Sequence, residues 1–153
     1  MKPLSYEQAL NRAASLCSSS EHCTGEMNEK LRKWGLTEAE SAKAIAYLVN
    51  ERYIDDERFC RAYANDKFRY SHWGRIKISQ MLRHLGLSDP DIEEGLSVID
   101  EEAYAEAIRQ ALSQKARTLN DEDPYQRKGK LVRHLLSRGF EMSLVLDMVD
   151  DIV

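Results

Sequence analysis

Four cationic side chains recur at matching distances from a glycine in the second and last thirds of the chain. Arg75 and Lys128 lie eleven positions before a glycine, and Lys77 and Lys130 lie nine positions before the same two glycines. Ammonium and guanidinium groups bind oxyanions such as phosphates and carboxylates. The repeated placement predicts a positive stripe that suits a phosphate backbone or an acidic groove on a protein.

The charges around these positions are segregated by sign. Residues 67–84 and 125–138 contain bases without a carboxylate, whereas residues 88–106 and 141–151 contain acids without Lys or Arg. We therefore predict that eight cations contact a partner or nucleic acid: Arg69, Arg75, Lys77, Arg83, Lys128, Lys130, Arg133 and Arg138. The alternative is that these are solvated helix faces whose charges neutralise acidic neighbours.

The sequence carries no constellation of residues typical of catalysis. It lacks a phosphate-cradling glycine loop, an HExxH zinc motif and a nucleophile elbow. Paired carboxylates such as Asp55 with Asp56 fall at predicted helix starts, where capping explains them. We therefore predict no catalytic residue, no cofactor and no enzymatic activity.

The three cysteines, Cys17, Cys23 and Cys60, give an odd number in a chain without a secretory signal. This argues against a disulfide framework. His22 next to Cys23 does not create the ligand spacing of a zinc finger. We interpret the cysteines as buried thiols and predict no metal site.

Composition indicates a chain that stays in the cytoplasm. Of the 153 residues, 42% are hydrophobic and 31% are charged. A mean hydropathy of -0.57 and the lack of a long apolar run argue against a membrane span, and the first residues lack the apolar core of a signal peptide. A net charge of -4 weakens the hypothesis of a protein that binds nucleic acid by charge alone.

Helical periodicity runs through the chain in three similar rounds. Gly35, Gly86 and Gly139 align, and apolar residues match in four columns: four positions before each glycine and one, ten and thirteen positions after it. Units of this size bury too little surface to fold well alone, so stacking should complete their cores. The prediction is an all-α protein, an elongated and curved array of three tandem three-helix repeats at about 1–53, 54–99 and 100–153.

Several local features follow from this pattern. Thr24 is a predicted N-cap, Thr37 begins a capping box, and Asp55 caps the next helix. Among the apolar residues, these are predicted to face inward: Ala42, Ile45, Leu48, Val49, Ile78, Met81, Leu82, Leu85, Met142, Val145, Leu146, Val149 and Ile152. Phe68, Tyr70, His72 and Trp73 either stack on nucleic-acid bases or fill a seam between helices.

The residues at the centre of the chain resemble the RecX family, bacterial modulators of the recombinase RecA. The match is strongest in the run Tyr-Ile-Asp-Asp-Glu-Arg-Phe at residues 53–59. It continues through Gly-Arg-Ile-Lys-Ile at 74–78 to Gly-Leu at 86–87, and includes Ser-Arg-Gly-Phe at 137–140. Residues 18–23 depart from the pattern, because they are polar to acidic where the family has a basic stretch.

The resemblance implies three tandem three-helix repeats and binding along the groove of the filament of RecA on single-stranded DNA. It further implies inhibition of strand exchange, ATP hydrolysis and co-protease activity, in homologous recombination, DNA repair and the SOS response. Single-stranded DNA could be contacted directly, and we expect a monomer. The residues themselves leave open a direct nucleic-acid-binding helical module related to helix-turn-helix proteins, or a scaffold for another protein.

Overall fold

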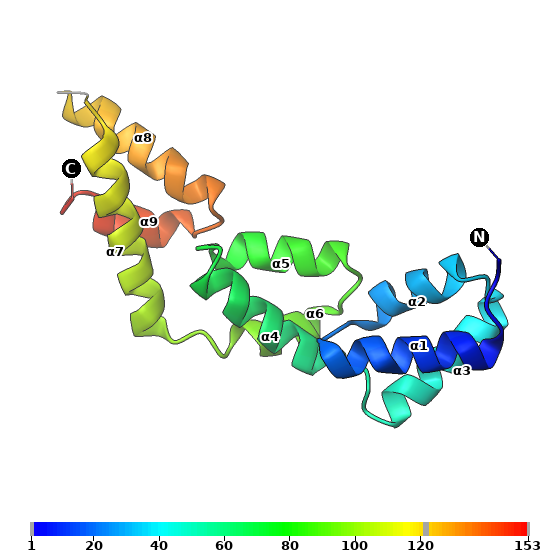
Figure 1. The fold of residues 1–153 in the computed structure, drawn as a ribbon. Coiled ribbons are helices and arrows are strands. Elements are labelled where there is room, and N and C mark those ends of the chain that lie inside the picture. Colours follow the sequence, from blue (N-terminus) through cyan, green and yellow to red (C-terminus); the bar gives the residue numbers. More distant parts are fainter. Residues whose placement is uncertain (1, 121–122, 153) are drawn as a thin grey trace. The chain divides into compact units, whose positions relative to one another are not determined.

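A computed structural model describes residues 2–120 and 123–152 of the chain (Figure 1). Within these ranges every regular element is a helix, which confirms the all-α prediction. The helices are α1 (Tyr6–Ser19), α2 (Thr24–Lys33), α3 (Glu38–Asn50), α4 (Asp56–Arg69), α5 (Arg75–His84), α6 (Asp89–Leu96), α7 (Glu101–Thr118), α8 (Pro124–Ser137) and α9 (Met142–Val149). Part of the predicted loop between α7 and α8, residues 121–122, lies outside the described residues.

The aligned glycines end the middle helix of each repeat in the same way. Gly35, Gly86 and Gly139 have φ angles of +104°, +91° and +93°, which glycine adopts without a Cβ clash. In each case the glycine N–H and the next N–H donate back to carbonyls of the last helical turn, which is the Schellman arrangement. The leucine of that turn and the apolar residue after the glycine are both buried. The columns predicted nearest each glycine are therefore core positions.

Polar residues cap several of the helices, and Thr37 and Asp55 do so as predicted. Ser5 and Thr37 form capping boxes with Gln8 and Glu40, and Asp55 Oδ1 accepts the N–H of Arg58 at 3.0 Å. The prediction that Thr24 is an N-cap is wrong by one residue, because Cys23 holds that position.

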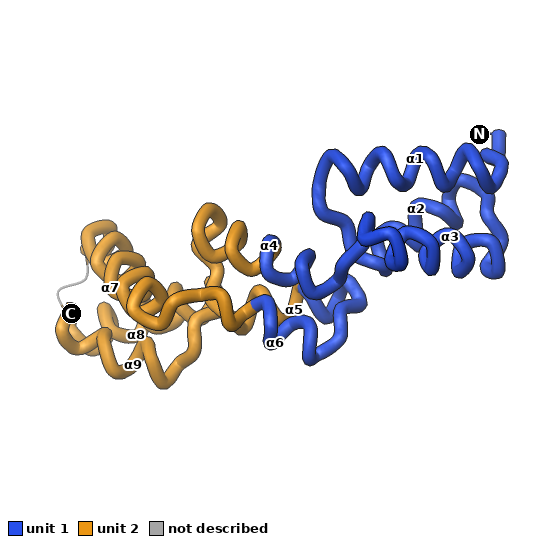
Figure 2. Tube along the Cα trace, turned by 90° about the horizontal axis from the view of Figure 1, so that it is seen from below, with its two compact units in different colours: residues 1–62, 82–95 blue, residues 63–81, 96–153 orange. Residues whose placement is uncertain are grey.

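The contacts divide the chain into two compact units (Figure 2). Unit 1 contains residues 1–62 and 82–95, and unit 2 contains residues 63–81 and 96–153. Helices α4 and α5 each contribute residues to both units. The second predicted repeat is thus shared between the units, and its boundaries, like those of the other repeats, stay a prediction of the sequence.

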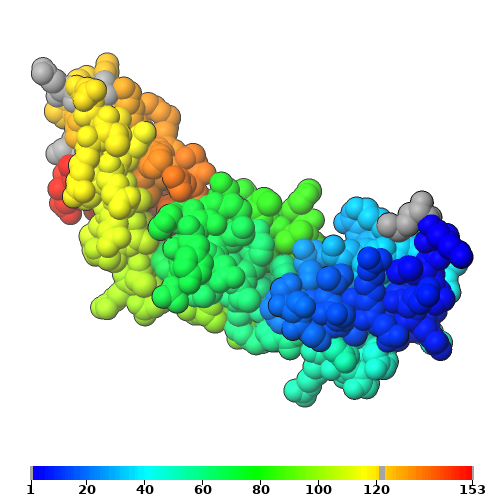
Figure 3. All heavy atoms as spheres, viewed as in Figure 1, coloured from blue at the N-terminus to red at the C-terminus, as the bar shows by residue number. Residues whose placement is uncertain are grey.

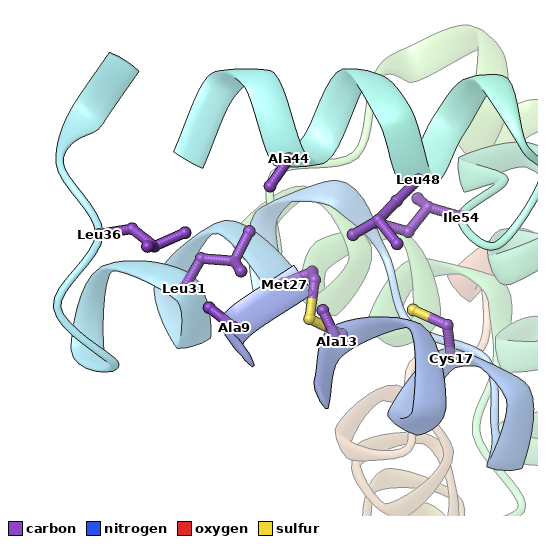
Figure 4. Close-up of a cluster of buried hydrophobic side chains, with 9 residues drawn as sticks. All are labelled: Ala9, Ala13, Cys17, Met27, Leu31, Leu36, Ala44, Leu48 and Ile54. Atoms are coloured by element: carbon purple, nitrogen blue, oxygen red, sulfur yellow. The ribbon is translucent and has the colours of Figure 1, made fainter. Parts of the chain in front are cut away.

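Helices α1, α2 and α3 surround one cluster of buried residues in unit 1 (Figure 4). Its buried residues are Ala9, Ala13, Cys17, Met27, Leu31, Leu36, Ala44, Leu48 and Ile54. The predicted inward face of α3 is partly wrong, because Ser41, Ala44 and Leu48 are buried while Val49 is 46% exposed and Ala42 is exposed. The small side chains of Ser41 and Ala44 leave room for the neighbouring helices, and this packing selects the face.

Helices α7, α8 and α9 pack around the core of unit 2, and Figure 3 shows side chains of α7 (yellow) against those of α8 (orange). Tyr104 lies at its centre, 1% exposed, with its ring 5.7 Å from that of Phe68 and 5.4 Å from that of Phe140. Met142 and Leu146, predicted to face inward, are 52% and 41% exposed. Val145 and Val149 already cover the core side of α9, so the other two residues are left on its outer side.

The second repeat shows the same kind of correction. Ile78 and Leu82 of α5 are fully buried as predicted, but Met81 is 37% exposed. Leu85, directly after α5, is only partly buried, and so is Ile152 in the third predicted repeat. A helix this short buries one narrow stripe, so an apolar residue at the edge of that stripe stays in contact with solvent.

Candidate functional site

The eight predicted contact cations do not share one environment. Arg83 belongs to unit 1, and the other seven belong to unit 2. That all eight lie along one stripe therefore stays a prediction. Within unit 2 the cations differ in burial and in the partners that they contact.

The first turn of α5 carries Arg75 and Lys77 and is tied to the end of α8. The N–H groups of Gly74 and Ile76 donate to the carbonyls of Arg138 and Gly139 at 2.8 and 3.0 Å. The N–H of Arg75 donates to the Tyr104 hydroxyl at 3.0 Å. The first N–H groups of a helix have no partner within the helix, and a capping side chain often accepts their hydrogen bonds. At the start of α5, the carbonyls after α8 and the Tyr104 hydroxyl accept them instead. Gly74 permits this approach, because a Cβ there would lie 2.5 Å from Phe140 N.

The Arg75 side chain forms an internal cluster with residues from α7 and from the start of α9. Its guanidinium lies 2.8 Å from Glu101, 3.1 Å from Glu141 and 3.9 Å from the centre of the Tyr104 ring. The Tyr104 hydroxyl in turn donates a short hydrogen bond to Glu141. We call these four residues the Arg75 cluster. Arg75 is 23% exposed, and two carboxylates of its own unit already neutralise its charge.

The electrostatics of the Arg75 cluster agree with this geometry. Burial lowers the pKa of Arg75, but its contacts with the carboxylates of Glu101 and Glu141 outweigh burial, and the net direction is upward. Burial raises the pKa of the Tyr104 hydroxyl, and the hydrogen bond to Glu141 raises it further. The cluster therefore holds Arg75 charged and Tyr104 protonated.

Lys77 lies over the ring of Trp73, with its Nζ 4.6 Å from the ring centre. Lys67 also approaches this ring, at 4.8 Å. Such cation–π contacts contribute roughly 0.5–1 kcal/mol at exposed sites. The side chains of Trp73 and Lys77 are partly buried, so the indole serves first as a platform for two lysines of its own unit.

Two further cations form exposed ion pairs. Arg83 lies 3.1 Å from Asp89, and Lys128 lies 2.9 Å from Asp150. Exposed pairs of this kind stabilise a fold by about 0–1 kcal/mol. A partner carboxylate could therefore exchange with Asp89 or Asp150 at little cost, and both cations remain reachable.

Helix α8 brings Lys128, Lys130 and Arg133 together around an apolar groove. The groove has a volume of about 500 Å³. Its other walls are mainly apolar or uncharged: Tyr125, Gln126, Gly129, Val132, Leu136 and Met142. Tyr125 is 85% exposed and Met142 is 52% exposed. We call this feature the α8 groove.

The remaining two cations lie outside the α8 groove. Arg138 donates to the carbonyl of Ser71 at 3.5 Å. Arg69 is the last residue of α4 and is exposed. The structure thus gathers three of the eight predicted residues at one hollow and uses Arg75 inside unit 2.

Sequence reasoning missed the apolar part of the α8 groove and the partners of Arg75. Leu131, Val132, Leu135 and Leu136 make the apolar arc of α8 wider than one core face needs, and this width is a signal of a second apolar surface. No such signal connects Arg75 with Glu141, because the two are 66 residues apart and meet only through folding.

The described residues show neither a membrane span nor a metal cluster. No helix among them is both long enough and apolar enough to cross a bilayer. Within residues 2–120 and 123–152, no three His, Cys, Asp or Glu side chains lie close enough to hold a metal ion. The three cysteines are free and buried, as predicted.

Three family models match consecutive parts of the chain. The first, second and third three-helix domains of RecX match residues 9–48, 55–96 and 101–148. The chain is 33% identical to the regulatory protein RecX of Chlorobaculum tepidum over 141 residues, which is 92% of this chain and 86% of that protein. It is 28% identical to the protein of the same name from Leuconostoc mesenteroides, over 97% of this chain but 56% of that longer protein.

Solved structures show the same fold. The crystal structure of RecX from Lactobacillus salivarius superposes with a TM-score of 0.88 at 19% identity, covering 96% of each chain. A second RecX crystal structure gives a TM-score of 0.86 at 22% identity, covering 95% of this chain and 71% of the other. The three domain models and the relatives agree, and the chain belongs to the RecX family.

Proposed function

We propose that this chain is a non-enzymatic regulator that binds the RecA filament on single-stranded DNA. On this proposal it inhibits strand exchange, ATP hydrolysis and co-protease activity, in DNA repair and the SOS response. It acts in the cytoplasm as a monomer without a cofactor. The membership in a family of regulatory proteins supports the regulatory part of the proposal.

The α8 groove is the observation that carries the choice of a protein partner. Protein interfaces combine an apolar centre with a polar rim, and opposite charges across the rim speed association and set the register. The groove offers Tyr125 and Met142 as apolar contacts, with Lys130 and Arg133 beside them. Contact with a bare phosphate backbone would not require the exposed apolar side chains. We therefore assign the groove to an acidic, partly apolar surface on the recombinase.

A co-sedimentation experiment with RecA filaments tests the proposal. The variant Lys130→Glu with Arg133→Glu reverses two charges at the groove, and we expect it to lose at least tenfold in affinity for the filament. Arg32→Glu with Lys33→Glu is the matched control, because these two exposed cations lie on α2 of unit 1. Arg75 stays unchanged in all variants, since its loss would disturb unit 2 itself.

The outcomes separate the hypotheses. Equal sedimentation of the groove variant and the control variant would show that the α8 groove is not the contact surface. Titration of labelled single-stranded DNA without RecA, at two salt concentrations, tests the direct nucleic-acid module. Tight binding with a steep salt dependence would favour that alternative over the filament.

A further inference from the structure

Unit 2 also contains a cavity of about 140 Å³ beside residues 107–115 of α7. One face of α7 forms its floor, with two alanines and the polar side chains of Gln110, Gln114 and Lys115. His134 lines it from the last turn of α8, Arg138 from the residue after that helix, and His72 from the segment after α4. Phe68 and Phe140 also line the cavity. We call it the α7 cavity.

The polar groups of the α7 cavity are cationic or neutral. No described residue that lines it carries a carboxylate. Among the ion pairs of the described chain, none joins Lys115 or Arg138 to an acid. Positive groups gathered without a counter-charge repel one another, and a bound anion relieves that repulsion.

The pKa of His134 responds to this positive environment. Burial lowers the pKa of His134, and the charges of Arg138 on its own helix and of Lys115 on α7 lower it further. Lys130 and Arg133 line an adjoining hollow that also includes Lys115 and His134. Every charged group that the described structure places around the imidazole at these hollows is therefore a cation. An anion at this position would reverse the effect on the imidazole.

The turn after α4 places His72 at the cavity. His72 has a φ angle of +58°, and the next N–H, that of Trp73, donates to Lys67 O at 3.0 Å in the last turn of α4. Arg52 has a similar φ angle of +61° after α3, so this conformation belongs to the end of the helix. The hydrogen bond from Arg138 to Ser71 O at 3.5 Å holds the backbone next to His72.

We propose that the α7 cavity is an oxyanion site that takes a phosphate group, either free phosphate or a phosphodiester of single-stranded nucleic acid. The donors approach from α7, from α8 and from the loop before α5, and a tetrahedral phosphate presents oxygens in several directions. A planar carboxylate would satisfy fewer of these donors. The site uses Lys115, His72 and His134, none of which lines the α8 groove. The proposal therefore does not depend on the binding of the recombinase at that groove.

The histidine signals in NMR spectra provide a direct test on the whole chain. The protein has four histidines, and His22 and His84 belong to unit 1. On titration with inorganic phosphate at constant ionic strength, we expect saturable shifts at His72 and His134 and a raised pKa of His134. His22 and His84 should not shift with them. A short single-stranded oligonucleotide is titrated in a parallel arm.

A substitution that adds a charge sharpens the test. Gln114→Glu places a carboxylate in the α7 cavity at an exposed helical position, and we expect phosphate affinity to fall at least tenfold. Gln80→Glu, an exposed position on α5, is the matched control with the same change in charge. Amide spectra of both variants check that the fold is kept.

Each outcome decides between defined alternatives. Saturation by phosphate alone supports the site with free phosphate as ligand, and tighter saturation by the oligonucleotide supports the site with a phosphodiester as ligand. Equal, unsaturable shifts at all four histidines would show screening only and would overturn the proposal. Shifts at His72 and His134 with a poly-glutamate peptide but not with phosphate would overturn it in favour of a carboxylate ligand.

Discussion

At the scale of single residues, the Arg75 cluster shows that a side chain predicted to contact a partner also has contacts within its own unit. The alignment of Arg75 with Lys128 marks it as a contact for a partner, but the fold surrounds it with Glu101, Glu141 and Tyr104. Lys128 occupies the aligned position in the next repeat and forms an exposed ion pair with Asp150. Equivalent positions in a repeat can therefore serve different purposes, because their neighbours come from different segments.

The hydroxyl of Tyr104 is predicted to matter for the stability of unit 2. Tyr104→Phe removes a group that accepts from the N–H of Arg75 and donates to Glu141. Two partly buried polar groups lose their partner, so we expect the free energy of unfolding to fall by about 1–3 kcal/mol. Urea unfolding measures the change. Tyr125→Phe, at an 85% exposed tyrosine, should change stability by less than about 0.5 kcal/mol, and equal effects would contradict the prediction.

The buried thiols predict a pH dependence of stability. Burial raises the pKa of Cys23 and of Cys60 to about 12, from the ordinary value of 9.0 that we expect in the unfolded chain. Between these values the unfolded chain releases protons that the folded chain keeps, so the free energy of unfolding falls as pH rises. Below pH 9 both states keep the protons and the thiols contribute no pH dependence.

Unfolding by urea at pH 8 and at pH 10 checks this prediction. We expect the loss of stability to be smaller in the double variant Cys23→Ala with Cys60→Ala, by up to about 1.4 kcal/mol per pH unit for each thiol. All other ionisable groups are the same in both proteins, so their contributions cancel in the comparison. If the double variant lost as much stability as the parent chain, ionisation of the thiols would not be the cause.

At the scale of helices, the glycines that end α5 and α8 have the same backbone shape but different surroundings. A Cβ added to Gly86, at φ +91°, would meet no atom within 4 Å, whereas a Cβ on Gly139, at φ +93°, would lie 2.6 Å from Lys77 N. The two sites thus share the conformational cost of a side chain, and only Gly139 adds a collision with α5.

The pair of variants Gly86→Ala and Gly139→Ala isolates this contact between helix ends. Both should be destabilised by strain at positive φ, by about 1–2 kcal/mol. Gly139→Ala should lose roughly 1–3 kcal/mol more, because the start of α5 must move away from α8. Thermal and urea unfolding measure both variants. Equal losses would show that the end of α8 yields to the added methyl group without cost.

At the scale of the whole molecule, the three repeats of the sequence are not the compact units of the structure. Residues 63–81 of the second repeat belong with the third repeat in unit 2, and residues 82–95 belong with the first repeat in unit 1. Helices α4 and α5 therefore each contain residues of both units. The elongated and curved shape predicted for the array stays a prediction.

Truncation after Ile99 tests whether residues 63–81 depend on the rest of unit 2 for their stability. The fragment 1–99 keeps residues 63–81 but loses α7, α8 and α9, which satisfy the first N–H groups of α5. We expect amide hydrogen exchange at residues 74–78 to become at least roughly tenfold faster than in the full chain, because local opening is no longer opposed. Exchange in α1 to α3 provides the internal control. Unchanged protection at residues 74–78 would contradict the assignment of this segment to unit 2.

The sequence by itself determined the helices, the caps Thr37 and Asp55, and the glycines that end the middle helix of each repeat. These features depend on neighbours within about one helical turn, so local spacing carries them. The apolar columns around Gly35, Gly86 and Gly139 also follow from the sequence, because a core needs apolar residues at helical spacing. The family resemblance, stated from the motifs at residues 53–59 and 74–78, is confirmed.

Only the tertiary structure decided which cations are held inside the protein and which line a hollow. Arg75 and Lys130 look alike in the sequence, since each lies on a basic helix before a glycine. Glu141 reaches Arg75 across 66 residues of chain, and Tyr125 and Met142 come together beside Lys130 only when α8 meets the start of α9. The physical reason is that the environment of a charge depends on side chains brought close by folding, and helical spacing carries no record of them.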